Sequence, residues 1–257
     1  MRRLIAGANR GALDLPRPQM GLRGQAMQTG IGPFDCLLVG GAGGVIKGAG
    51  SGGGGGGGVV QAEGFMLPPG VYSGTIGAGD PGGLSITRTR GGDTIALFWR
   101  AFGGGNGGKS GDGAFGGADG GCGGGAQREV TGFGRGIVGQ GHDGGEADVG
   151  VVGGGGGGAG GPGSGTSGGP GVVSDITGAS VQYGTGGGTG PGSNDPSPGR
   201  GFSAPSGTAG GHGGFVLRYP TGKARVTGGT VTTSGSYTIH TFDTPGAFAF
   251  TVWRVSK

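Results

Sequence analysis

Residues 52–60 read GGGGGGGVV, a run of seven glycines that leads into two valines. Glycine supplies 82 of the 257 residues of the chain. Because glycine has no side chain to bury and loses the most backbone entropy on folding, such tracts cannot build an ordinary hydrophobic core. A glycine tract that folds must therefore be held by backbone packing, with strands or partner chains fixing its ends.

Two conformations suit these tracts: disorder, or packed helices of the polyproline-II type with three residues per turn. Without Cβ atoms, such helices approach closely and bond through backbone N–H and C=O groups. Along 106–118 an every-third-residue pattern is typical of one edge of a three-fold helix, although chance periodicity remains an alternative. Its members are Asn106, Lys109, Asp112, Phe115 and Ala118. The segment lacks the proline and the strict repeat of collagen, so we predict polyglycine-II packing.

Short apolar or alternating stretches frame the glycine tracts and predict β-strands. They cover 34–39, 71–76, 84–89, 94–102, 215–219, 230–233, 237–242 and 247–255. No segment shows helical periodicity beyond two turns. We therefore predict an all-β fold without substantial α-helix. It would be a jelly-roll-like β-sandwich with glycine-rich excursions packed as polyglycine-II helices. Residues 33–214 would form the glycine-rich domain, and 215–257 a strand module that completes the sandwich.

The net charge of +4 is located in the N-terminal arm, residues 1–32. The arm carries five arginines against Asp14, so the rest of the chain is balanced. These arginines are Arg2, Arg3, Arg10, Arg17 and Arg23. Their wide spacing favours docking on a protein partner over binding nucleic acid, and a disordered tail is the alternative. No apolar run is long enough to cross a membrane, and no secretory leader is expected.

The sequence predicts no catalytic residue, no cofactor and no bound metal. Residues 103–110 match the phosphate-binding P-loop pattern, but the glycines that follow cannot form the helix that such a loop requires. An acidic cluster at 142–148 could hold Ca²⁺, but solvated loop charges are the favoured interpretation. Cys36 and Cys122 give no disulfide framework, and two reduced thiols are the favoured state.

Four aromatic residues inside the glycine region are candidate receptor contacts, because aromatic side chains dominate interface energetics. They are Phe115, Phe133, Tyr183 and Phe202. The alternative is that these side chains fill the boundary between the glycine helices and the sandwich.

Several segments resemble the glycine-rich domain that is common in bacteriophage tail proteins. They are FDCLLVGGAGG at 34–44, LPPGVYSGTIGAGD at 67–80 and GGHGGFVLRYP at 210–220. The segment GGTVTTSGSYTIHTFDTPGAFAFTV at 228–252 resembles the β-module that often ends such proteins. In composition alone, the chain also resembles T-even-type phage adhesins, whose glycine helices carry receptor-binding loops.

The resemblance implies a non-enzymatic virion protein of a tail fibre or tail tip, assembled in the host cytoplasm and acting as a homotrimeric adhesin in host attachment. The arm would anchor it to other virion proteins, and loops would contact a protein or glycan receptor. No nucleic acid and no membrane insertion are implied. The alternative is an architectural minor tail or head-appendage protein that cements neighbouring subunits. A third reading, a depolymerising enzyme, lacks a convincing pair of carboxylates.

Overall fold

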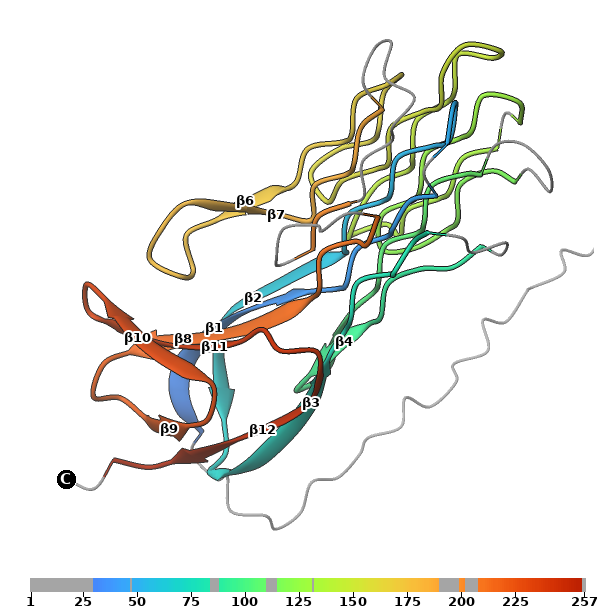
Figure 1. Ribbon diagram of the computed structural model, residues 1–257. Helices are drawn as coiled ribbons and strands as arrows, with labels where there is room; N and C mark the ends of the chain where they lie inside the picture. Colours follow the sequence, from blue (N-terminus) through green and yellow to red (C-terminus); the bar gives the residue numbers. More distant parts are fainter. Residues whose placement is uncertain are drawn as a thin grey trace, which may run out of the picture.

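The fold is all-β, as predicted (Figure 1). The structure, a computed structural model, describes residues 30–46, 48–83, 88–109, 115–130, 132–189, 199–201 and 208–255. Within these ranges the chain forms strands, turns and extended glycine segments, and no helix. The arginines of the arm, Asp112 and Phe202 lie outside the described residues.

Two five-stranded antiparallel sheets form the body. The first sheet has the order β10-β11-β8-β1-β2 and the second β5-β4-β3-β12-β9. The first sheet comprises β1 (Ile31–Val39), β2 (Val59–Leu67), β8 (Gly214–Pro220), β10 (Thr230–Ser234) and β11 (Tyr237–Phe242). The second comprises β3 (Gly70–Ile76), β4 (Thr94–Ala96), β5 (Trp99–Ala101), β9 (Arg225–Thr227) and β12 (Gly246–Trp253). Strands after residue 213 thus complete both sheets, although this order does not confirm a jelly roll.

The central strands of the first sheet, β1 and β8, are largely buried on both faces, whereas β10 at its edge is exposed. Cys36 and Leu38 belong to an apolar cluster with residues of the second sheet, whereas Leu37 and Val39 belong to a second cluster. That second cluster includes residues of the glycine region and of a separate hairpin, β6 (Val172–Ser174) and β7 (Val181–Tyr183). Burial on both faces explains why β1 reads as a continuous apolar run rather than an alternating one.

Residues 52–58 lie at the centre of the glycine region, and their hydrogen-bond partners repeat every third residue. Representative bonds run from Gly52 N to Gly108 O, Gly55 N to Gly105 O, Gly53 N to Gly154 O and Gly56 N to Gly157 O, all 2.8–2.9 Å long. None of residues 52–58 has a positive φ. A repeat of three with bonds to different neighbours is the geometry of a polyproline-II-type helix, which confirms the predicted packing. We call these packed segments the glycine lattice.

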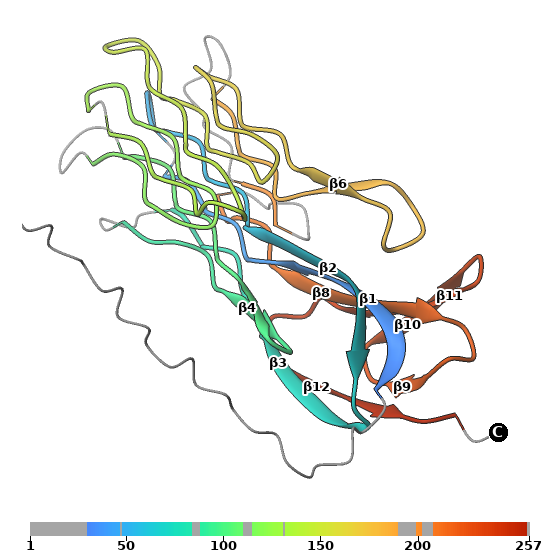
Figure 2. The same cartoon turned by 180° about the vertical axis from the view of Figure 1, so that it is seen from behind.

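Carbonyl oxygens crowd the position that a side chain would occupy in the lattice. A Cβ atom added at Gly55 would lie 2.3 Å from the carbonyl oxygen of Cys122, and one at Gly105 would lie 1.9 Å from that of Ala118. These distances are far shorter than van der Waals contact, so the close approach of neighbouring backbones requires glycine. Figure 2 shows the lattice extending as a bundle from one end of the sheets.

Three details of the sequence prediction are wrong or incomplete. The strand expected at 94–102 is a hairpin, because the chain turns at Leu97, whose φ is +56°, and Phe98. Arg88 and Thr89 of the strand expected at 84–89 are not in a strand, and 84–87 lie outside the described residues. Strand β2 extends continuously through Glu63 and Gly64, where no strand was expected.

The single three-fold helix expected along 106–118 is also wrong. Lys109 and Phe115 exchange backbone hydrogen bonds of 2.9 and 3.1 Å, so the chain reverses between them. After the reversal, Ala118 N donates to Asn106 O at 2.9 Å. The predicted edge is therefore divided between two neighbouring segments of the lattice.

Candidate functional site

The far end of the glycine lattice is a set of tight turns, which lie away from the two sheets (Figure 1). Isolated bridges close three of these turns, at residues 127–130, 148–152 and 164–167, which we call the distal turns. Side chains are possible here because the segments no longer pack against each other on every side. The distal turns therefore carry the side-chain diversity that the lattice excludes.

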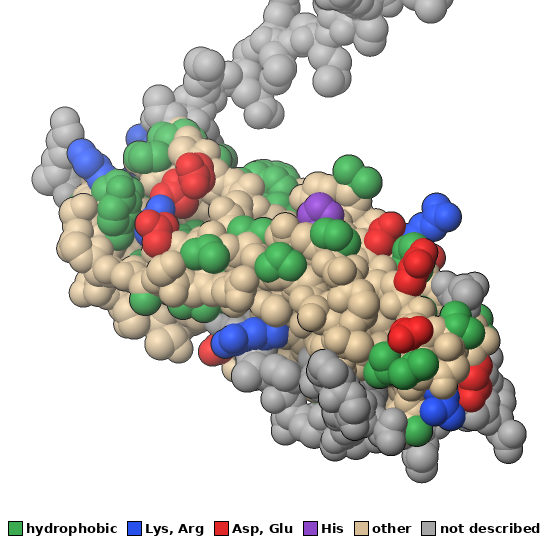
Figure 3. Space-filling model, turned by 90° about the horizontal axis from the view of Figure 1, so that it is seen from above, with side chains coloured by type: hydrophobic (Ala, Val, Ile, Leu, Met, Phe, Trp, Pro, Cys, Tyr) green, Lys and Arg blue, Asp and Glu red, His purple; other side chains and the backbone are tan. Residues whose placement is uncertain are grey.

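Apolar and charged groups lie together on the distal turns. Val149 and Val151 are each 62% exposed on the 148–152 turn. On the 127–130 turn, Arg128 Nε lies 3.6 Å from a carboxylate oxygen of Glu129. The two turns are joined, because Gly150 N donates a 2.9 Å hydrogen bond to Arg128 O. Figure 3 shows most of the charged side chains of this face toward its two ends, while hydrophobic side chains are scattered over the mostly tan surface between them.

The predicted aromatic contacts are not gathered on one exposed surface. Phe115 and Phe133 are both half-buried, and Phe115 follows the reversal at the distal end. Tyr183 is only 2% exposed and packs in the second apolar cluster. Its position matches the alternative in which an aromatic side chain fills the boundary between lattice and sheets, and it is not available to a receptor. Phe202 lies outside the described residues.

The exposed valines of the turns are not predicted from the sequence. Val149 and Val151 flank Gly150, which has a φ of +80°. A valine on each side of a glycine in a glycine-rich tract indicates a turn with exposed branched side chains, but it also resembles a short buried strand. The same ambiguity applies to Val138, which is 97% exposed in a turn at the end of the lattice nearest the sheets.

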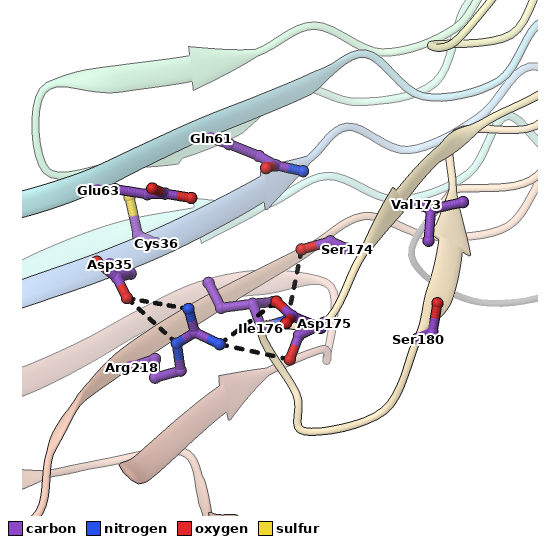
Figure 4. Close-up of a pocket in the computed structure, with 10 residues that line it drawn as sticks. All are labelled: Asp35, Cys36, Gln61, Glu63, Val173, Ser174, Asp175, Ile176, Ser180 and Arg218. Carbon is purple, nitrogen blue, oxygen red and sulfur yellow. Dashed lines mark hydrogen bonds and ion pairs between the residues drawn. The ribbon is translucent and has the colours of Figure 1, made fainter. Parts of the chain in front are cut away.

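A hollow of about 250 Å³ lies between the β6–β7 hairpin and the outer face of the first sheet (Figure 4). Asp35 of β1, Glu63 of β2 and Arg218 of β8 face it from the sheet. Ser174 of β6 and Ser180 just before β7 face it from the hairpin.

The Arg218 side chain bonds to acidic residues on both sides of this hollow. Its Nε and Nη2 atoms donate to Oδ2 of Asp35 at 3.2 and 3.1 Å, which follows from the direct pairing of these residues between β1 and β8. Oδ1 of Asp35 accepts a 3.0 Å bond from Gly64 N. The Nη1 atom lies 3.5 Å from Oδ1 of Asp175, and the guanidinium lies 4.8 Å from the centre of the Tyr237 ring. The guanidinium is thus occupied on several sides.

The thiols near these features are not nucleophiles at neutral pH. Burial raises the pKa of Cys36, which borders the hollow, to about 12. Burial likewise raises the pKa of Cys122 to about 12. Both cysteines are free and buried in different apolar clusters, as expected of two reduced thiols. Only the thiolate is an effective nucleophile, so neither side chain supplies one.

The described parts of the chain contain neither a cluster of metal-ligating side chains nor a helix that could cross a bilayer. Over the residues that the structure places, no three histidine, cysteine, aspartate or glutamate side chains come together as metal ligands. The acidic cluster considered for Ca²⁺, which includes Asp143 and Asp148, falls within these residues. The same ranges hold no helical segment with the length and apolarity that a bilayer crossing requires.

A protein-family model matches the chain. The model of the glycine-rich domain family matches residues 24–245, which is most of its length. The chain therefore belongs to the glycine-rich domain family. No curated protein and no solved structure gives a significant match.

Proposed function

We propose that this glycine-rich domain protein is a bacteriophage virion component of a tail fibre or tail tip that contacts the host surface through its distal turns. The segments at 34–44, 67–80, 210–220 and 228–252, which resemble tail proteins, support the virion assignment. The receptor-binding role rests on one observation: the lattice excludes side chains, and the distal turns display them at the end away from the sheets.

The position of the first described residue, Gly30, supports this orientation. Gly30 borders a cavity with Lys223 and Arg254 at the end of the sheets opposite the lattice. The basic arm therefore joins the body at the end remote from the distal turns. An arm that anchors to a larger virion protein there would leave the turns pointing outward. We extend the proposal to a homotrimer anchored by this arm, with the basic residues Lys223, Arg225 and Arg254 beside the anchor.

Binding to intact host cells tests the receptor role. The double substitution Val149→Ser, Val151→Ser removes exposed apolar surface from one distal turn without disturbing a buried group. Val138→Ser is the control, because it changes a turn valine that is even more exposed but lies at the end nearest the sheets. We expect the double variant to bind cells at least about tenfold more weakly, which corresponds to the loss of about 1.4 kcal/mol. The control should bind like the unmodified protein.

The same proteins separate adhesion from a purely architectural role. If both variants bind cells equally well, or if the unmodified protein never binds, contact through the distal turns is refuted. If the double variant instead fails to join virions, the turns contact neighbouring subunits and the architectural reading holds. A protein that lacks residues 1–29 should keep cell binding but lose incorporation into virions.

A further inference from the structure

Two hollows adjoin under the β6–β7 hairpin. The first is the 250 Å³ hollow described above, and the second has a volume of about 210 Å³ and is bordered by Ser234 and Tyr237. Both are bordered by Asp175 and Arg218, whose contact lies between them. Together they form a strip along the outer face of the first sheet, which we call the hairpin groove.

The size of the hairpin groove suits two linked small rings. Each hollow is large enough for several water molecules, because a cavity volume of roughly 10–15 Å³ is enough to hold one water. Each volume is comparable with one hexose ring and its hydroxyl groups. Two such volumes in a row match two consecutive units of an oligosaccharide better than one compact ligand.

The lining offers hydrogen bonds to hydroxyl groups from both sides. Figure 4 shows Gln61 and Glu63 on the strand side, with Ser174 and Ser180 on the hairpin side. Carboxylate oxygens accept, while amides and hydroxyls both donate and accept, which is the combination that neighbouring sugar hydroxyls need. Tyr237, 37% exposed, borders the second hollow, where the Arg218 guanidinium lies 4.8 Å from the centre of its ring and occupies one face.

The charged side chains that line the groove affect sugars differently, according to the charge of the sugar. Among the residues that the structure places, Arg218 is the one basic residue that borders either hollow, and it is already paired with Asp35 and Asp175. Glu63 makes no ion pair with any residue that the structure describes, and it leaves the first hollow with uncompensated negative charge. A carboxylate on the ligand would meet this charge without a free cation to offset it, whereas an ammonium group would be attracted.

We propose that the hairpin groove binds a short oligosaccharide of neutral or amino-bearing hexoses and rejects uronic acids. This site is separate from the distal turns and does not depend on their role. The hairpin that covers it is held in place by Ile176, which is 5% exposed in the second apolar cluster. The groove is therefore formed before the ligand arrives, which lowers the entropic cost of binding.

Titration of the full-length protein with three disaccharides, built from glucose, glucosamine or galacturonic acid, tests the proposal by nuclear magnetic resonance. We expect the first two to shift resonances of groove residues with dissociation constants of about 1 mM, a value typical of weak ligands. The glucosamine disaccharide should bind several-fold more tightly than the glucose disaccharide. The galacturonic acid disaccharide should cause no shift.

Glu63→Gln is the decisive variant, because this exposed side chain can change without disturbing the fold. It should weaken glucosamine disaccharide binding about fivefold, because the ammonium group loses an opposite charge. Glucose disaccharide binding should change much less, because the amide of Gln still bonds to hydroxyl groups. Glu146→Gln, an exposed carboxylate in the lattice region, is the matched control and should change neither affinity. The proposal is overturned if no disaccharide binds at about ten times the expected constant, if galacturonic acid binds as tightly as glucosamine, or if the two variants behave alike. Because these readouts need no cells, failure of adhesion through the distal turns leaves them unaffected.

Discussion

Gly55→Ala tests whether the glycine lattice is held by backbone contact. Gly55 lies in the central segment, where its Cβ would lie 2.3 Å from the carbonyl oxygen of Cys122 and 2.7 Å from that of Gly123. Ordinary contact begins near 3.4 Å, so the methyl group is about 1 Å too close to a rigid backbone atom. The segment must move, because no flexible side chain is available to yield.

The cost of that movement follows from the bonds around Gly55. Its N–H donates to Gly105 O at 2.8 Å, and its carbonyl accepts from Gly43 N at 2.8 Å. A shift of about 1 Å stretches both beyond the usual limit of about 3.2 Å. Overpacking costs about 1–3 kcal/mol and each lost bond about 1 kcal/mol, while the lower entropy of the unfolded alanine chain returns about 0.4–1 kcal/mol. We expect the free energy of unfolding to fall by about 3 kcal/mol, a large share of the total for a domain.

Urea unfolding followed by tryptophan fluorescence measures this change. Gly132→Ala is the matched control, because the nearest atom to its Cβ is Arg88 Nη2 at 3.9 Å and its φ is not in the positive region. We expect this control to be more stable than the unmodified protein by about 0.4–1 kcal/mol. The two midpoints should thus move in opposite directions. Equal midpoints for Gly55→Ala and Gly132→Ala would show that the lattice has room for side chains, and the packing described above would be wrong.

Two further predictions concern the junctions of the fold. Gln140→Ala removes hydrogen bonds of 2.9 and 2.8 Å to the backbone of Phe102 and Arg100. Urea unfolding should therefore show a free energy of unfolding that is lower by about 2 kcal/mol. Gln140→Glu keeps the acceptor oxygen, so it should lose about half as much. Burial lowers the pKa of His240 from its ordinary 6.5, so the unfolded chain takes up a proton before the folded chain does, and stability should fall as the pH drops through 6.5. Unfolding measured between neutral and acidic pH should lose this dependence in His240→Gln, and an unchanged profile would contradict it.

The sequence predicts the sheets well where burial controls the pattern. The apolar run at 34–39 corresponds to most of β1, whose alternate side chains enter two different clusters. The sequence does not predict strand β2, because Glu63 and Gly64 interrupt its apolar pattern. In the structure Gly64 has a φ of +67°, and its N–H bonds to Asp35 on the neighbouring strand. That contact, rather than local preference, carries the strand through the interruption.

Two features of the structure cannot be predicted from the sequence. One is the position of the chain reversals in the lattice, and the other is the hairpin groove. A tract of glycine gives little sign of where it turns, so the period of three along 106–118 could not reveal the reversal between Lys109 and Phe115. The groove joins residues far apart in the chain, such as Asp35 and Arg218, through strand register. Register depends on which strands pair, and a single sequence gives no direct measure of it.

Glycine is required for two different structural reasons in this chain. The difference explains how the lattice can support a surface whose residues can be substituted. At Gly55 the requirement is space, because a neighbouring carbonyl occupies the side-chain position. At Gly150 nothing lies within 4 Å of the added Cβ, and the requirement is only a φ of +80°. Residues beside turn glycines, such as Val149 and Val151, are therefore free of the packing that fixes the lattice. Substitutions there alter the exposed surface while the hydrogen-bonded segments behind them stay the same, which is the property that a recognition surface on a rigid support requires.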